Sequence, residues 1–497
     1  MKILLEMRPA LDGGHDGIAQ ETCLLFRGLR LIDGIDVAGL IQSSSHVLVK
    51  GLPPISSKPP SAPTHKQLDR QSRVVISLQK ELSSVNLAIV CMVLRHLARR
   101  SEKLSRFEAK PFHDFIWRSL FAHTLHVDDF HDVVNADYRI ARVPWAGMHM
   151  CALAMRKIGY SLYPRLDTTG FDAMISETPY PGTVSPETKL IVRYHDAVPL
   201  LMPHTIAYMR RHQAFHYHAL RKNAASGALF ACVSEATRKD LLSIFPEVES
   251  RSFTIHNMVS HNYFPEESSP KLVPTIIKTR LNDRLILSGH GQAAINAALN
   301  GGDKALLPGY LLMVSTIEPR KNHLTLLAAW ECLRVEKYPD LKLIVVGKLG
   351  WGYQSIVKKF RPWMDQGEVF MLADVAASEL RVLYKHARAT VCPSYKEGFD
   401  FSGVEAMRCG SCVAASDIAV HREIYDDATE YFNPYSVAST ADAIDKLITA
   451  DHASYREQLI HRGQEVSKRY LPTNILPKWQ QFLQSRVRAT TPHDLPI

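Results

Sequence analysis

Short, continuously apolar segments alternate with helical ones along most of this chain, and this alternation limits the folds available to it. The first residues show the pattern: an apolar strand at 3–5, a glycine-containing loop at 8–17, a helix at 18–31 and a second strand at 35–41. Similar alternation returns at 171–260 and at 310–415. Strands without polar alternation are typical of parallel sheets that helices cover on both faces. The pattern therefore predicts an α/β protein with doubly wound, Rossmann-like sheets.

The length of 497 residues indicates two large domains. A mixed stretch, rich in Pro, Gly, Asn and acidic residues, separates the two α/β regions, and residues 77–125 carry helical periodicity. We predict that the C-terminal helix crosses back to the N-terminal domain. The expected divisions are an N-terminal Rossmann-like domain with a helical elaboration at about 50–165, a linker or insert, a C-terminal Rossmann-like domain, and a final helix and tail, at 1–270, 271–307, 308–475 and 476–497.

Charge and cysteine content narrow the classes of partner and compartment. A net charge of +9 favours anionic partners, but no helix-turn-helix, zinc-finger or base-stacking pattern indicates nucleic acid. Eight scattered cysteines are too few for a disulfide framework and fit a reducing compartment. The start lacks the pattern of a signal peptide, and the most apolar run, 85–94, is shorter than the roughly 20 residues that a membrane span needs. We expect a cytoplasmic protein, at most peripheral at the inner face of the cell membrane.

The most specific motif occupies 393–413, with the sequence PSYKEGFDFSGVEAMRCGSCV. Glu397 and Glu405 stand eight positions apart, and a helix is predicted to start near Ser402. Backbone N–H groups at a helix start hold phosphate oxygens, and a carboxylate accepts hydrogen bonds from neighbouring sugar hydroxyls. An isolated pair of acids would indicate a solvated loop. Placed between a buried strand and a helix, the pair predicts a sugar-nucleotide site.

A second motif, STIEPRKNH at 315–323, follows the first strand of the second α/β region and opens a helix. Arg320 and Lys321 are adjacent cations at the carboxyl end of a strand, where ligands of open α/β sheets bind. Two such cations neutralise a departing diphosphate, which is the main electrostatic requirement of a transfer from a nucleotide sugar.

Two weaker signals lie in the N-terminal region. The loop GGHDGI at 13–18 allows close approach of backbone amides to an anion. It lacks the Lys-Ser/Thr pair of a Walker A loop, and an ordinary glycine loop is the alternative. His195 follows a buried strand and could hold a proton or donate to the leaving phosphate or the sugar. A structural histidine is its alternative.

Together these strings resemble the retaining GT-B glycosyltransferases of family 4, which carry the E-x7-E motif. The resemblance is clear over about 308–437 and fainter over 1–30 and 171–260. It is closest to bacterial mannosyltransferases that build O-antigen or capsule chains. It implies two Rossmann-like domains facing each other, a nucleotide-sugar donor held mainly by the C-terminal domain, and no cofactor or metal.

The same resemblance assigns roles position by position. Glu397 would meet the hydroxyls of the donor sugar and Glu405 the ribose. Arg320 and Lys321 would bind the diphosphate, and His195 would lie beside the donor sugar. We therefore predict Glu397, His195, Arg320 and Lys321 as the catalytic residues.

The remaining donor-binding predictions also come from the resemblance. The N-terminal glycine loop would approach the phosphates, the loop after the strand at 341–346 matches a family glycine loop, and residues 372–375 fall where the family's backbone contacts the base. The predicted residues are Gly14, Gly17, Gly347, Lys348, Asp374, Gly398, Phe399, Ser402 and Gly403.

The sequence departs from the family pattern in the loop that touches the donor sugar. Asp400-Phe401-Ser402 stands where Gly-Leu-Pro is common after Gly-Phe, which leaves the donor open. GDP-mannose is our first expectation and UDP sugars are the next. The acceptor is expected to be a saccharide or a lipid-linked saccharide. Gln20 stands where the family often has Arg, and residues 50–165 match the family poorly.

Two other functions remain open at this stage. One is a nucleotide-sugar epimerase on the same fold, which would need no acceptor. The other is a non-catalytic partner in polysaccharide assembly. An apolar helical stripe at 112–121, with basic residues nearby, predicts either core packing or contact with a membrane surface. The His- and Asp-rich segment 123–132 has the composition, but not the spacing, of a metal site.

Overall fold

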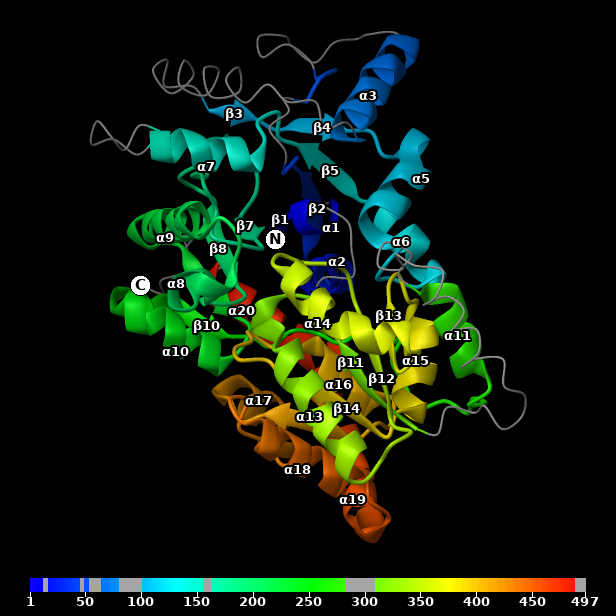
Figure 1. Ribbon diagram of the computed structural model, residues 1–497. Coiled ribbons are helices and arrows are strands. Elements are labelled where there is room, and N and C mark those ends of the chain that lie inside the picture. Colours follow the sequence, from blue (N-terminus) through cyan, green and yellow to red (C-terminus); the bar gives the residue numbers. More distant parts are fainter. Residues whose placement is uncertain are drawn as a thin grey trace.

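The computed structural model describes residues 1–11, 17–44, 49–52, 64–79, 101–154, 162–281 and 309–487. These residues form two parallel sheets, one in each half of the chain, with helices on both faces of each sheet (Figure 1). The predicted two-domain α/β fold is therefore confirmed.

The N-terminal sheet has the strand order β10-β9-β8-β7-β1-β2-β5-β4, and every pairing in it is parallel except that of β4 with β5. The order in which strands are added reverses between β1 and β7, because β2 lies on one side of β1 and β7 on the other. We call such a place the reversal point of the sheet. The strands are β1 (Lys2–Glu6), β2 (Asp36–Ile41), β4 (Ser105–Phe107), β5 (Asp137–Ile140), β7 (Ala173–Ser176), β8 (Lys189–Tyr194), β9 (Leu229–Cys232) and β10 (Ser252–Thr254). A separate two-stranded sheet pairs β3 (Glu102–Lys103) with β6 (Leu166–Asp167).

Helices connect these strands and cover both faces of the sheet (Figure 1). They are α1 (Arg8–Leu11), α2 (Gly17–Arg30), α3 (Thr64–Gln79), α5 (His113–Ile116), α6 (Phe130–Val134), α7 (Trp145–Ala154), α8 (Val198–Leu201), α9 (Met209–Ala225) and α10 (Glu235–Ile244). A π-helical turn, η2 (Trp117–Phe121), continues α5.

The C-terminal sheet is entirely parallel, with the order β13-β12-β11-β14-β15-β16. Its reversal point lies between β11 and β14, because β12 lies on one side of β11 and β14 on the other. The strands are β11 (Tyr310–Val314), β12 (Lys342–Val346), β13 (Val369–Leu372), β14 (Ala389–Cys392), β15 (Val413–Ser416) and β16 (Glu430–Phe432). The helices are α11 (Leu272–Arg280), α13 (His323–Glu336), α14 (Tyr353–Asp365), α15 (Ala377–His386), α16 (Phe401–Arg408), α17 (Ala419–Tyr425), α18 (Val437–Ile448), α19 (Ala453–Lys468) and α20 (Pro472–Arg486), with the short turn η9 (Pro319–Lys321) before α13.

Each sheet separates two apolar clusters, because successive side chains of a strand point to opposite faces. Along β1, Ile3 and Leu5 enter one cluster and Leu4 enters the other. Along β11, Leu311 and Leu312 likewise separate. This division explains why the central strands have runs of apolar residues without polar alternation.

Helix α20 crosses back to the N-terminal domain, as predicted. Its apolar side chains belong to the cluster that contains β1 and α2, and a Cβ on Gly28 of α2 would stand 2.6 Å from the Leu476 side chain, so Gly28 lets α20 approach α2 closely. Trp479 is fully buried and lies under the guanidinium of Arg193, which is 5.2 Å from the ring centroid. The last helix of the chain is thus part of the N-terminal core.

Two segments differ from the sequence expectation. The prediction of helix throughout 77–125 is wrong at 102–107, where β3 and β4 form, since β4 extends the edge of the sheet by pairing with β5. Residues 80–100 lie outside the described part of the chain. Residues 272–280, expected within a linker or insert, form α11, whose Val273, Ile276 and Ile277 pack in the C-terminal core. Residues 282–307 of that segment are not described.

The apolar stripe at 112–121 packs in the protein core, which is one of the two predicted alternatives. Ile116, Leu120 and Phe121 are buried in the N-terminal core, and Phe115 and Trp117 pack against it. Among the described residues, no helix is both long and apolar enough to cross a bilayer. Nor do the described residues contain a group of three or more His, Cys, Asp or Glu side chains able to hold a metal, and the His- and Asp-rich segment 123–132 lies within them.

Candidate active site

The predicted cations and the first glutamate of the motif come from the two loops at the reversal point of the C-terminal sheet. Arg320 and Lys321 lie in η9, after β11, and Glu397 lies on the loop between β14 and α16. Asn322 ties these loops together, because its side-chain amide donates to the carbonyls of Pro393 (3.0 Å) and Pro434 (2.9 Å). Reversal points are where open α/β sheets bind ligands.

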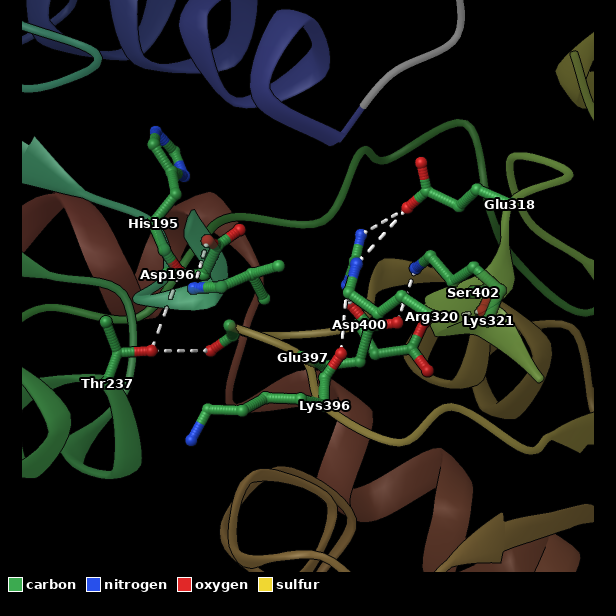
Figure 2. A network of polar contacts seen from close by, with 12 residues as sticks. His195, Asp196, Thr237, Glu318, Arg320, Lys321, Lys396, Glu397, Asp400 and Ser402 are labelled. Carbon is green, nitrogen blue, oxygen red and sulfur yellow. Dashed lines mark hydrogen bonds and ion pairs between the residues drawn. The ribbon is translucent and has the colours of Figure 1, made fainter. Parts of the chain in front are cut away.

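These three side chains form a buried ionic cluster (Figure 2). Arg320 Nη1 donates to Glu397 Oε2 at 2.7 Å, and Lys321 Nζ donates to Glu397 Oε1 at 2.5 Å. The other edge of the Arg320 guanidinium donates to Glu318 at 2.8 Å. Burial alone would favour the protonated form of Glu397, but Arg320 and Lys321 outweigh it and lower its pKa. Glu397 is therefore an ionised carboxylate, and both cations are held in place before any ligand binds.

The start of α16 adjoins this cluster. Asp400 precedes the helix with φ 66°, a left-handed conformation that favours Gly and that Asp tolerates better than most residues. Its carboxylate accepts from the Ser402 hydroxyl at 2.7 Å and lies 3.2 Å from His421 Nε2. Burial opposes ionisation of Asp400, yet the hydrogen bond to His421 and the charge of Lys321 hold its pKa below the usual value. The departure from the family's Gly is thus compensated by α17, which supplies His421.

The second glutamate of the motif, Glu405, lies in the middle of α16 and contacts the N-terminal domain. The side-chain amide of Gln20, in α2, donates to Glu405 Oε1 at 3.0 Å, and the Tyr384 hydroxyl lies 3.3 Å from Oε2. Burial raises the pKa of Glu405 to about 7 although both hydrogen bonds oppose the shift. Glu405 therefore titrates near neutral pH.

The two domains meet directly beside Glu397. A Cβ atom on Gly398 would stand 1.8 Å from the backbone carbonyl oxygen of His195, so only glycine permits this approach. The Thr237 hydroxyl of α10 lies 3.3 Å from the Gly398 carbonyl (Figure 2). Lys396 Nζ forms an ion pair with Asp240 at 2.7 Å.

A second interdomain contact involves Glu423 of α17. Its carboxylate accepts from the first two backbone N–H groups of α10, at Glu235 (2.7 Å) and Ala236 (2.8 Å), and lies 2.8 Å from His256 Nε2. Free N–H groups at a helix start attract a carboxylate. One domain thus caps a helix of the other.

His195 lies at the carboxyl end of β8 and is supported from within the N-terminal domain. Its Nε2 is 3.1 Å from Glu177 Oε2, at the end of β7. Burial lowers the pKa of His195 to about 4, and burial raises the pKa of Glu177 to about 8. Near neutral pH the pair is uncharged, so Glu177 donates its proton to Nε2 and His195 is a weak base.

Several other predicted donor-binding residues serve the packing of the domain. Phe399 is buried against Phe401 and Tyr470 rather than facing the cleft. Gly403 makes room for Tyr425, and Gly347 makes room for the Ser315 carbonyl.

Gly17 touches Phe401 across the domains, at the start of α2. Lys348 and Asp374 are exposed, on the loops after β12 and β13. Gly14 lies outside the described residues. The structure therefore brings together Arg320, Lys321, Glu397 and Ser402, and it places Glu405 on the same helix as Ser402.

Four polar residues of the site were missed in the sequence: Glu318, Glu177, Glu423 and His421. Glu177 directly follows a buried strand, and Glu318 stands two residues before Arg320, so position after a strand was the available signal for both. Glu423 and His421 lie on α17, and no sequence pattern indicates that this helix reaches Asp400 and α10.

The two facing sheets, the ionic cluster at the reversal point and the returning C-terminal helix define the GT-B fold of glycosyltransferases. Residues 303–466 match the family described as Glycosyl transferases group 1. The chain thus contains a glycosyltransferase group 1 domain and is homologous to O-antigen mannosyltransferases of Escherichia coli.

This chain spans only part of the length of the relatives that it matches. The O-antigen chain mannosyltransferase B of Escherichia coli is 27% identical over 252 residues, which are 51% of this chain and 59% of that protein. The serotype-specific mannosyltransferase WbdA of Escherichia coli is 32% identical over 165 residues, which are 33% of this chain and 19% of that protein.

Solved structures share the fold across the whole chain. Sucrose-phosphate synthase from Thermosynechococcus elongatus superimposes with a TM-score of 0.57 at 14% identity, covering 99% of this chain and 100% of the other. Anabaena Alr3699/HepE in complex with UDP-glucose gives a TM-score of 0.52 at 15% identity, covering 98% and 100%. At such identity the likeness shows the fold alone.

Proposed function

We propose that this protein is a retaining glycosyltransferase that moves a sugar from a nucleotide-sugar donor to a saccharide or lipid-linked saccharide in bacterial surface polysaccharide synthesis. The ionic cluster of Arg320, Lys321 and Glu397 carries the proposal. It lies at the reversal point of the C-terminal sheet, inside the region that matches the glycosyltransferase family.

The cluster is suited to a diphosphate. Arg320 and Lys321 are both held by Glu397, so the cations are oriented before the donor arrives. The backbone N–H groups at the start of α16, beside Ser402, supply further donors to phosphate oxygens. Preorganised charge of this kind stabilises the transition state without the cost of reorienting dipoles during the reaction. No metal or other cofactor is part of the proposal.

The rest of the donor would extend along α16. Glu397 is ionised and can accept hydrogen bonds from hydroxyls of the sugar. Glu405, when ionised, can accept hydrogen bonds from two hydroxyls of the ribose. Gln20 now donates to Glu405, so we propose that ribose replaces this contact.

The mechanism follows from the weakness of the available bases. Glu397 has a lowered pKa and two cationic partners, and the pKa of His195 is about 4. Neither removes a proton from a sugar hydroxyl efficiently near neutral pH. We propose that the departing phosphate takes the proton of the acceptor hydroxyl, which then attacks the face that the phosphate leaves, with retention of configuration.

The relatives favour mannose from GDP-mannose as the first donor to test, because those covering half and a third of this chain are mannosyltransferases by name. UDP sugars follow, since one structural neighbour binds UDP-glucose. If the acceptor is lipid-linked, the protein would meet it at the inner face of the cell membrane.

Thermal unfolding with a panel of nucleoside diphosphates and nucleotide sugars tests the donor site. A ligand at 100 times its dissociation constant stabilises a protein by about 2.7 kcal/mol. We expect stabilisation by one base, lost in Lys321→Ala and in Glu405→Ala. Absence of a shift with every nucleotide would refute the donor site, and stabilisation without turnover on any acceptor would favour a non-catalytic partner. Interconversion of the donor without acceptor would indicate an epimerase.

A further inference from the structure

The N-terminal sheet has its own reversal point, between β1 and β7, and the residues that follow these strands form a second buried polar cluster. Arg8 follows β1, and Glu177 and Thr178 follow β7. Arg8 Nε donates to Glu6 at 2.7 Å, and its Nη2 donates to the Thr178 hydroxyl at 3.0 Å. Glu6 also accepts from the Glu177 backbone N–H at 3.0 Å. By the same topological argument as before, this edge of the sheet is a place for a ligand.

Aromatic side chains pack beside Arg8. The guanidinium lies over the ring of Trp145, 4.2 Å from its centroid. His149, one turn further along α7, packs edge-on against Trp145 with centroids 4.2 Å apart and stacks on Phe215 at 4.7 Å. These contacts fix the positions of Trp145 and Arg8.

Within the described part of the chain, three polar atoms of this cluster are buried without a hydrogen-bond partner: Trp145 Nε1, His149 Nε2 and Glu177 Oε1. Buried polar atoms are nearly always paired, and an unpaired one costs roughly 1–3 kcal/mol. Three such atoms around one arginine are therefore unfavourable in the ligand-free protein. A ligand with several hydroxyl groups would satisfy both donors and acceptors among them.

The charges of the cluster indicate an uncharged ligand. Arg8 is neutralised by Glu6 at 2.7 Å. Burial raises the pKa of Glu177 to about 8 and lowers that of His149 well below its usual value, so both are neutral near pH 7. The cation that lies on Trp145, Arg8, is already paired with Glu6, so an anionic ligand would gain little from it, whereas a sugar hydroxyl both donates and accepts.

The cluster is joined to the proposed donor site. Glu177 contacts His195 at 3.1 Å, and the His195 backbone touches Gly398, next to Glu397. Trp145 and His149 come from α7, within the 50–165 segment that resembles the family least. The segment that matches the family least thus lies beside the place where an acceptor would approach the donor sugar.

We propose that Arg8, Trp145 and Glu177, with His149 behind them, form an acceptor subsite for a neutral pyranose ring. This inference rests on the proposed function and adds the class of acceptor and the residues that hold it. The ring would lie against Trp145, and its hydroxyls would pair with the indole N–H and with Glu177.

Saturation-transfer NMR on the full chain, with the nucleotide found by thermal unfolding present, tests the subsite. The probes are the methyl α-glycosides of mannose, glucose and glucuronic acid. We expect a neutral glycoside to bind and the glucuronide not to bind. Trp145→Phe keeps the ring but removes the N–H group, so affinity should fall about 3- to 10-fold, the effect of one hydrogen bond. Glu177→Ala should reduce it at least as much.

Trp479→Phe is the matched control, because Trp479 also has a buried Nε1 without a partner among the described residues and an arginine over its ring, but it belongs to α20 in the N-terminal core. It should leave glycoside affinity unchanged. Trp145→Phe should still unfold cooperatively, and its retained nucleotide binding shows that the fold is intact. Glycoside binding that is equal in Trp145→Phe, Glu177→Ala and the parent, binding of the glucuronide alone, or nucleotide binding with no glycoside binding would overturn the subsite. Failure of nucleotide binding itself would instead refute the proposed donor site.

Discussion

Gly398→Ala tests whether the close approach of the two domains is needed for transfer. The added Cβ would stand 1.8 Å from the His195 carbonyl oxygen, and ordinary contact begins near 3.4 Å. The backbone of Gly398 does not have a positive φ, so alanine is not strained there for conformational reasons. Both opposing atoms belong to backbone or Cβ, and no side-chain rotation relieves the clash. The domains must therefore separate by about 1.6 Å at this point.

The expected cost follows from that displacement. The N-terminal loop carrying His195 would move relative to Glu397, and misplacement by about 1 Å in a reacting geometry costs about 100-fold in rate. That factor corresponds to about 2.7 kcal/mol in the activation free energy. Nucleotide affinity should change by less than about threefold, since Arg320, Lys321 and the start of α16 all lie in the C-terminal domain and keep their relative positions.

The assay compares kcat/KM for transfer with the dissociation constant of the donor in the same preparation. Gly463→Ala is the control, because the atoms nearest to a Cβ there belong to Met407, inside the C-terminal domain, and the nearest is the flexible Met407 Cγ at 2.9 Å. It lies in α19, where alanine is favoured over glycine by up to about 1 kcal/mol. Full transfer activity in Gly398→Ala would refute the reasoning, and so would loss of donor binding equal to the loss of rate.

Three further predictions concern the ionisable groups. The affinity for the nucleotide sugar, measured by calorimetry, should rise about tenfold between pH 6 and pH 8, because the pKa of Glu405 is about 7 and only its ionised form accepts two ribose hydroxyls; Glu405→Gln should abolish the dependence, and a dependence that persists would exclude Glu405 as its cause. Glu423→Ala should lower the free energy of unfolding by about 1–2 kcal/mol in urea, since the α10 N–H groups lose their acceptor, while Glu423→Gln, which keeps one oxygen, should lose less. Arg193→Ala should cost about 3–5 kcal/mol by the same measurement, because it leaves Glu21, fully buried and paired with it at 2.8 Å, without its cation; a loss below 1 kcal/mol would contradict this account.

The sequence was sufficient for the sheets and for the part of the site built on strand ends. Continuous apolar strands locate β1, β8, β11 and β14, and residues directly after parallel strands gather at one edge, so Arg320 and Glu397 could be placed together. The burial of Phe399 and the close approach of Tyr425 to Gly403 could not be predicted, because they depend on how this segment packs on Tyr425 and Tyr470.

Contacts between segments far apart in the chain could not be predicted from the sequence either. Gln20 meets Glu405 across 385 positions, and its pairing depends on the relative placement of two domains, which local periodicity does not encode. The short strand β4 was missed for a different reason. Its three residues form a strand only because β5 offers a free edge, which local sequence does not reveal.

The return of α20 to the N-terminal domain sets an order on folding during synthesis. All strands of the N-terminal sheet are made by Thr254, but the side chains that close its core follow only from Ile475 onward. At about 5–20 residues per second, the ribosome needs roughly 10–40 s to make the intervening chain. Throughout that interval the buried pair of Arg193 and Glu21 lacks the cover of Trp479. The N-terminal domain is thus translated first but completed last, and a nascent chain halted before α20 would expose this apolar surface to chaperones.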